Sequence, residues 1–141
     1  MNTRRWVGVL GVLLFFGVFA LPIRGEDSDG LVRVRAVRLN FIQGEAVLQQ
    51  EDGKEVDARS HMPLEEGFTL FTLPGGFAEI EFENRSIVRL GEESELYFSQ
   101  LALNSETGAK VTELLLRRGY ATFQVRFEKG GVFKVVTADA R

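Results

Sequence analysis

The chain has 141 residues, 45% of them hydrophobic, and no cysteine. This composition is ordinary for one globular domain, and the lack of cysteine excludes disulfide bonds and thiol catalysis. The net charge is −3, which argues against nucleic-acid binding because that affinity comes largely from clustered Lys and Arg. The densest basic groups are short, and we expect them on solvated strand faces: Arg33, Arg35 and Arg38, then Arg117 and Arg118.

The N-terminus has the order of a secretory signal. Residues 1–5 contain two arginines, residues 6–23 contain no charge, and the chain turns polar from Arg24. Export signals share this order of basic, apolar and polar regions. We therefore predict a hydrophobic signal helix within residues 1–25, followed by a polar linker at residues 26–31 and a single domain at residues 32–141.

Two points about this segment stay open. Cleavage follows either Ala20 or Gly25, and the alternative to cleavage is a membrane anchor. An anchor is the weaker interpretation because the apolar run is shorter than the roughly 20 residues that span a bilayer. In both cases the body of the chain is exported, which predicts a periplasmic or secreted protein, or one anchored in the inner membrane.

Beyond the linker, hydrophobic residues recur with a period of two, which indicates β-strands. The alternation from Leu31 to Leu39 slips by one residue near Val37, as a β-bulge would produce. A short strand is predicted for residues 45–50. Residues 55–67 are expected to form mainly a loop, with a short strand near residues 62–64.

The strictest alternation runs from Phe77 to Glu83. It follows a Pro-Gly pair at residues 74–75, which is typical of a type II turn. A tight turn after Glu83 predicts a hairpin, and the returning strand would bring Arg85 and Arg89 close to the acidic row. Opposite charges in such positions contribute roughly 0.2–1 kcal/mol each.

The remaining strands are predicted at residues 94–101, 111–117, 120–127 and 132–136. A helix at residues 111–118 is the weaker alternative, because two glycines flank only eight residues. About nine short strands with frequent turn signals predict an all-β fold. We expect antiparallel strands in a small sandwich or roll, or in a solenoid-like sheet.

No catalytic constellation emerges from the sequence. His61 is the one histidine, and a lone histidine cannot build a His-rich metal site. The adjacent acids Glu65 and Glu66 lack any sign of the pocket that acid–base catalysis needs, and we expect them to be solvated. Residues 84–86 match an acceptor sequon, although a turn explains them better.

Binding motifs are equally scarce. The acidic residues Glu79, Glu81 and Glu83 offer oxygen ligands for Ca²⁺, but alternate residues of a strand lie about 6.6 Å apart, too far for one cage. The glycine pairs at residues 75–76 and 130–131 precede strands rather than helices, so they are not phosphate loops. We therefore expect no catalytic, cofactor-binding or metal-binding residues, no cofactor and no enzymatic activity.

The order of turn glycines and alternating strands resembles the FecR-like domain family over about residues 32–137. The segments that carry the resemblance are Val37–Leu39, Gly44–Ala46, Pro63–Thr72, Gly76–Asn84, Ser86–Gly91 and the stretch around Gly119. The resemblance implies an extracytoplasmic all-β domain. The best-known members receive a signal outside the inner membrane and control a sigma factor inside it.

Three features depart from the family pattern. Only five residues precede the apolar segment, too few for the cytoplasmic helical domain of those regulators. Members also continue past the region of Thr137 with a further strand, so a C-terminally truncated domain is one interpretation. Arg85 stands where the family turn commonly has Gly.

We therefore predict a non-catalytic exported interaction or signalling module. Its expected partners are envelope proteins, or a second copy that pairs through a sheet edge. It contacts no nucleic acid, and a membrane only through an uncleaved N-terminus. The alternatives are a truncated fragment of a longer envelope sensor, and a small exported hydrolase that would need carboxylates such as Glu65, Glu66 and Glu92.

Overall fold

A computed structural model describes residues 30–32 and 35–138. The predicted signal helix and its cleavage sites lie outside the described residues. The described residues form strands and turns only. The strands are β1 Leu31–Val32, β2 Val37–Gln43, β3 Ala46–Gln49, β4 Glu55–Asp57, β5 Pro63–Leu64, β6 Thr69–Thr72, β7 Phe77–Phe82, β8 Ile87–Leu90, β9 Glu95–Asn104, β10 Lys110–Arg118, β11 Ala121–Gln124 and β12 Val132–Thr137.

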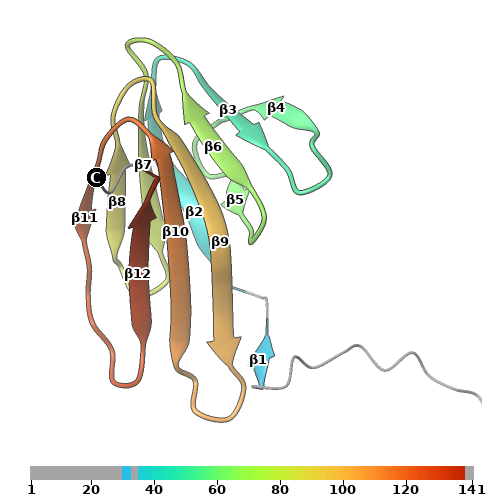
Figure 1. Ribbon diagram of the computed structural model, residues 1–141, viewed down its shortest axis with the longest axis vertical. Helices are drawn as coiled ribbons and strands as arrows, with labels where there is room; N and C mark the ends of the chain where they lie inside the picture. Colours follow the sequence, from blue (N-terminus) through green and yellow to red (C-terminus); the bar gives the residue numbers. More distant parts are fainter. Residues whose placement is uncertain (1–29, 33–34, 139–141) are drawn as a thin grey trace, which may run out of the picture.

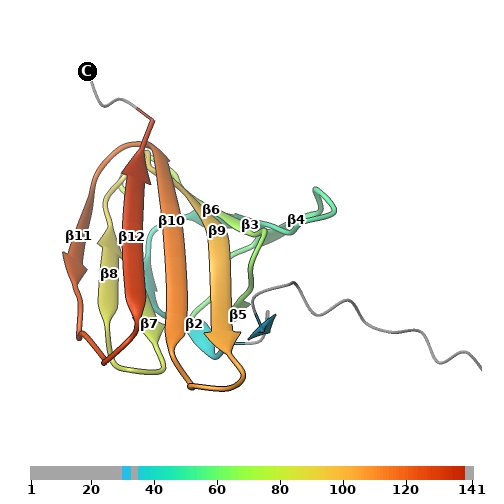
Figure 2. The same ribbon diagram turned by 60° about the horizontal axis from the view of Figure 1, so that its bottom comes forward.

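The strands form two sheets that face each other as a sandwich (Figures 1 and 2). Sheet A has the order β12-β10-β9-β6-β3-β4, with β1 paired to β9, and sheet B has the order β11-β8-β7-β2-β5. The all-β prediction is therefore confirmed. The expectation that all strands are antiparallel was wrong for one pair, because β12 runs parallel to β10.

That parallel pair follows from the path of the chain. After β10 the chain crosses to sheet B, forms β11 at the edge of that sheet, and returns to sheet A as β12 (Figure 2). Parallel neighbours need such a crossover, whereas antiparallel neighbours need only a hairpin. The strand at residues 111–117 is confirmed, and the helical alternative for residues 111–118 is wrong.

The core lies between the two sheets. Alternate side chains of each strand point inward, which follows from the period of two. Each fully buried aliphatic or aromatic side chain contributes about 1.5–3 kcal/mol relative to exposure. The largest of these side chains are Leu39, Leu64, Ile80, Phe82 and Leu90 in sheet B, and Leu48, Leu70, Leu96, Phe98, Leu101 and Leu114 in sheet A.

The slip in alternation has another cause than expected. The slip in alternation near Val37 is not a bulge: β1 pairs in sheet A and β2 in sheet B, so the chain changes sheets between them. A register shift does interrupt β2, but it lies between Leu39 and Phe41. Within residues 55–67, the short strand predicted near residues 62–64 is confirmed as β5, and β4 is a further short strand that was not predicted.

The strand predicted at residues 120–127 is shorter than expected, because β11 ends at Gln124. Beyond Gln124, hydrogen bonds between the backbone and side chains replace the backbone hydrogen bonds of the sheet. The Arg126 N–H donates to the Ser86 hydroxyl (2.9 Å), and the Asn84 amide donates to the Arg126 carbonyl (3.0 Å). The two polar residues of the sequon-like turn therefore hold the segment that leads to β12.

Arg35 joins the two sheets at one end of the sandwich. Its side chain is only 2% exposed, so the expectation of a solvated position was wrong for this residue. The guanidinium donates to Glu83 Oε1 (2.6 Å) after β7, and to the Val111 carbonyl (3.0 Å) and the Thr112 hydroxyl in β10. A buried charge needs such partners, since burial without them is costly.

A buried polar cluster fixes the turn between β10 and β11 at the other end. The Thr72 hydroxyl donates to the Gly91 carbonyl (2.5 Å) and accepts the Ser94 N–H (3.0 Å). The Ser94 hydroxyl in turn accepts the Tyr120 N–H (3.1 Å). Gly119 has φ +83° and lies against Ser94, where an added Cβ would come within 2.6 Å of the Ser94 Cα. This turn therefore requires glycine.

Candidate functional site

The acidic row of β7 is neutralised by arginines, not open to a cation. Glu79 accepts hydrogen bonds from Asn40 (2.7 Å) and Arg89 (2.8 Å). Because Arg89 lies opposite Glu79 in the hairpin, its predicted proximity to the row is confirmed. Glu81 and Glu83 pair instead with arginines of the N-terminal part of the domain: Arg38 at 3.4 Å and Arg35 at 2.6 Å.

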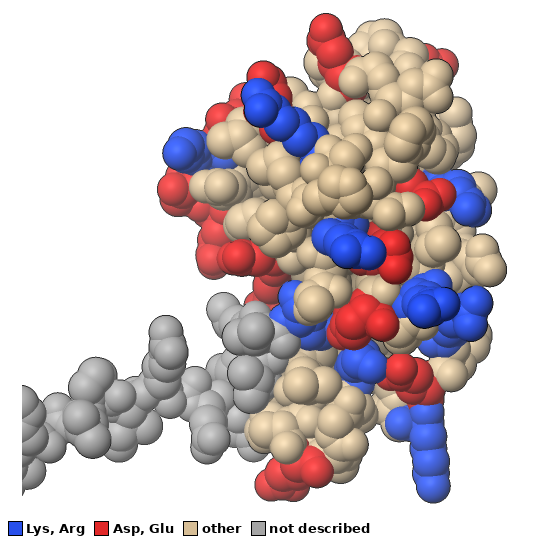
Figure 3. All heavy atoms as spheres, turned by 180° about the vertical axis from the view of Figure 1, so that it is seen from behind, with Lys and Arg blue, Asp and Glu red and all other residues tan. Residues whose placement is uncertain are grey.

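This pairing shapes the outer face of sheet B. Figure 3 shows basic and acidic side chains next to each other across this side of the molecule. No group of metal-ligating side chains occurs among the residues that the structure describes. The row therefore acts as a set of cross-strand ion pairs.

Arg85 also lies near the acidic row, as predicted, because it lines one pocket with Glu81 and Glu83. The backbone N–H of Arg85 donates to the Phe82 carbonyl (2.8 Å), and the φ of Arg85 is +63°, in the left-handed region. This conformation suits glycine, and Arg85 stands at the position where the resembled family commonly has glycine.

The other candidate residues lie in turns and loops between the strands. His61 is exposed in a turn, where its N–H donates to the Leu39 carbonyl (2.7 Å). Glu66 accepts the Leu101 N–H (3.0 Å) on β9, so the expectation that it is solvated was wrong. Glu92 accepts the Gly75 N–H (2.6 Å) of the predicted Pro-Gly turn. Glu65 is exposed.

The feature with potential for contact is a sheet edge. The sandwich has four lateral edges, formed by β4 and β12 in sheet A and by β5 and β11 in sheet B. Three of these strands have two to four residues; β5 begins with Pro63, and β4 exposes Glu55 and Asp57. Short strands, prolines and charges are the usual protection of an edge.

The fourth edge, β12, has six residues without proline or glycine. The Ala138 N–H donates to the Leu116 carbonyl (3.1 Å), which sets the side that faces β10. Backbone groups alternate sides along a strand, so those of Phe133, Val135 and Thr137 face outward. Lys134 is the one charged residue of β12, and Glu113 of β10 holds its ammonium at 3.0 Å.

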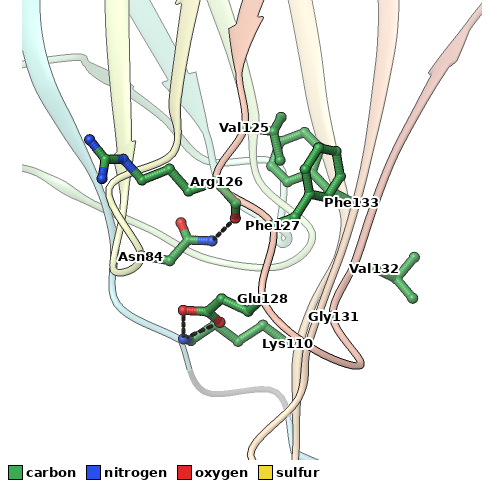
Figure 4. A pocket seen from close by; sticks show the side chains of 9 residues that line it. All are labelled: Asn84, Lys110, Val125, Arg126, Phe127, Glu128, Gly131, Val132 and Phe133. Atoms are coloured by element: carbon green, nitrogen blue, oxygen red, sulfur yellow. Dashed lines mark hydrogen bonds and ion pairs between the residues drawn. The ribbon is translucent and has the colours of Figure 1, made fainter.

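Aromatic side chains fill the opening between β11 and β12. Phe133 packs against Phe123 (ring centroids 6.4 Å apart) and against Phe82 (5.5 Å). Figure 4 shows Phe127 next to Phe133 at the lower end of this opening. Phe127 is 84% exposed and Val132 is 51% exposed, so the core is incompletely covered on this side.

Net charge is distributed unevenly along the chain. Residues 110–138, which include β10, β11 and β12, carry six basic and two acidic side chains, a net charge of +4. Residues 35–109 carry six basic and fourteen acidic side chains, a net charge of −8. We name the edge of β12 together with Phe127 and Val132 the C-terminal edge. It lies on the basic side of an otherwise acidic domain.

The sequence predicts contact through a sheet edge but does not specify which edge. The strand at residues 132–136 was predicted, yet its parallel pairing to β10 was not. That pairing depends on the chain returning to sheet A after β11, a tertiary choice that alternation does not encode. The uneven distribution of charge can be counted from the sequence. Its location on one side of the domain follows only from the fold, which brings β10, β11 and β12 together.

Comparisons with known proteins agree with this architecture. The fold defines an all-β module, and its described residues include no helix long and apolar enough to cross a membrane. A family model described as FecR protein matches residues 68–141, slightly more than half of the chain. The chain belongs to the FecR protein family, a regulatory family associated with the cell envelope.

A comparison with curated proteins found no match, and a comparison with solved structures found none. The family match begins just before β6 and therefore omits β2 and β3. Both strands are integral to the sandwich, since β2 pairs with β7 and β3 pairs with β6. The structural unit thus extends beyond the matched residues.

Proposed function

We propose that this chain is an exported, non-catalytic module that transmits a signal by binding an envelope protein. The observation that carries the proposal is membership of a regulatory family combined with an incompletely covered edge, at which Phe127 is 84% exposed. Monomeric proteins usually protect such edges. A protein whose role is contact has a reason to leave one open.

The domain organisation is part of this proposal. Residues 1–25 would direct export, residues 26–31 would act as a linker, and residues 32–141 would form the FecR-like domain. β1 at Leu31–Val32 pairs with the end of β9, which supports a domain that begins near this point. Expression of the full chain followed by mass measurement of the envelope form tests the organisation: cleavage after Ala20 or Gly25 supports it, and a full-length cytoplasmic form contradicts it.

Contact is tested by site-specific photo-crosslinking in cells. A photoreactive amino acid at Phe127 should capture a defined envelope protein, because this side chain is exposed beside the open edge. The same amino acid at Asp57, on the opposite edge of sheet A, is the matched control. The proposal fails if neither position yields a defined product, or if the product is a cytoplasmic protein.

A further inference from the structure

The C-terminal edge also indicates what kind of segment it would bind, provided that the proposed contact function holds. We propose that β12 receives an extended segment of a partner protein as an additional strand of sheet A. The segment would carry apolar side chains at every second position and acidic side chains between them. Three properties of the edge lead to this partner.

The first property is the backbone. The N–H and C=O groups of Phe133, Val135 and Thr137 face away from β10, and no hydrogen bond to them occurs among the described residues. An added strand satisfies such groups in a regular ladder, which is how strand addition supplies affinity. The groups of Lys134 and Val136 already face β10, so they take no part.

The second property is the apolar surface on both sides of the edge. Phe133 packs against Phe82 and Phe123 of the core and lines one opening together with Phe127, and inward side chains of an added strand would cover this opening. Covering exposed apolar surface contributes about 25 cal/mol per Å². Alternation is required because only one face of the added strand meets the opening.

The third property is charge. Lys134 lies on the outer face, with Glu113 as its neighbour on β10. A residue opposite Lys134 on an added strand would lie about 5 Å away, and a carboxylate there would place the lysine between two acids. β7 shows the complementary arrangement, with Glu79 between Asn40 and Arg89. The net charge of +4 over residues 110–138 favours an acidic partner more generally.

The chain itself contains a sequence of the required kind, FAEIEFE at residues 77–83, which supplies a test peptide. We expect the labelled peptide to bind the full-length chain and to shift the NMR signals of the Phe133, Val135 and Thr137 amides. A control peptide with lysine in place of each glutamate keeps the apolar pattern. It should bind about tenfold more weakly, a difference of about 1.4 kcal/mol.

Two variants locate the binding. Val135→Pro removes an N–H that β10 does not use, so the fold should persist while peptide binding is lost. Asp57→Pro is the matched control on β4, since the Asp57 N–H also faces outward from sheet A; it should bind normally. Lys134→Glu leaves the backbone intact and should weaken binding of the acidic peptide about fivefold.

The outcomes distinguish strand addition from self-association and from the proposed function. Equal binding of both peptides, or signal shifts away from β12, overturns the inference. The edge would instead bind a second copy if the chain forms concentration-dependent dimers, if Val135→Pro abolishes them, and if the acidic peptide does not compete with them. This result also overturns the inference. If photo-crosslinking at Phe127 captures an envelope protein equally well from Val135→Pro, the proposed function stands and the strand-addition inference fails.

Discussion

The two lateral sides of the sandwich are built differently. On one side, sheet A ends in three-residue β4 and sheet B in two-residue β5, with an acidic turn and a proline. On the other side, β11 and β12 enclose aromatic side chains and leave a six-residue edge. The first side has only two very short edge strands, so it presents few backbone groups for pairing. The second side is only partly covered by aromatic packing, and its six-residue edge can still pair with another strand.

The turns of the two sides offer the sharpest test of this difference. Gly119 leads from β10 to β11 with φ +83°, and Gly53 lies between β3 and β4 with φ +86°. An added Cβ at Gly119 would collide with Ser94, whereas nothing lies within 4 Å at Gly53. We expect Gly119→Ala to lose about 3 kcal/mol of unfolding free energy and Gly53→Ala about 1 kcal/mol. Urea denaturation measures both, and equal losses would contradict the comparison.

Side-chain truncation tests how much core packing stabilises each side of the sandwich. Phe133 contacts two other aromatic rings, while Val56 of β4 packs at the margin of the core. We expect Phe133→Ala to cost about 2–3 kcal/mol, below the range for fully buried aromatics, because the ring is partly exposed. Val56→Ala should cost about 1 kcal/mol. Thermal denaturation of both variants is the measurement, and a larger loss for Val56→Ala would reverse our interpretation.

Much of this architecture was predictable from alternation. The strict pattern from Phe77 to Glu83 predicted both β7 and the outward direction of its acids, because a period of two determines the faces of a strand. The Pro-Gly turn at residues 74–75 is confirmed, with Gly76 N–H donating to the Leu73 carbonyl (2.8 Å) and Gly75 at φ +73°. Local chemistry sufficed in both cases.

The failures all concern partners distant in the sequence. Arg35 is buried because Glu83 and Thr112 approach it from different sheets. Glu66 is occupied because β9 presents the N–H of Leu101 to it. No local pattern specifies these approaches. The same holds for the C-terminal edge, which exists only because β12 returns beside β10 after the chain has visited sheet B.

Hydrogen exchange should distinguish bonded from open amides along β12. The amides of Phe133 and Val135 face outward, whereas those of Lys134 and Val136 face β10. We expect the outward amides to exchange at least about tenfold faster, since open groups lack the protection of a ladder. Uniform protection across the four amides in dilute protein would show that the edge is already covered. Addition of the acidic peptide should slow the two outward amides only.

The smallest expected effect concerns the one ion pair that β12 makes. Lys134 donates a hydrogen bond to Glu113, and this bond lowers the pKa of that carboxyl, with help from the lysine charge and a hydrogen bond from Ser99. A pKa lowered by folding stabilises the protein at neutral pH, and this stabilisation disappears as the pH falls through the folded-state pKa. Lys134→Met should therefore raise the pKa of Glu113 and flatten the acid side of the stability curve, as NMR titration and denaturation at several pH values would show. Lys54→Met, in the turn before β4, is the control and should leave the Glu113 titration unchanged. If Lys134→Met also leaves it unchanged, the ion pair does not form, and Lys134 projects past the edge as a guard against pairing.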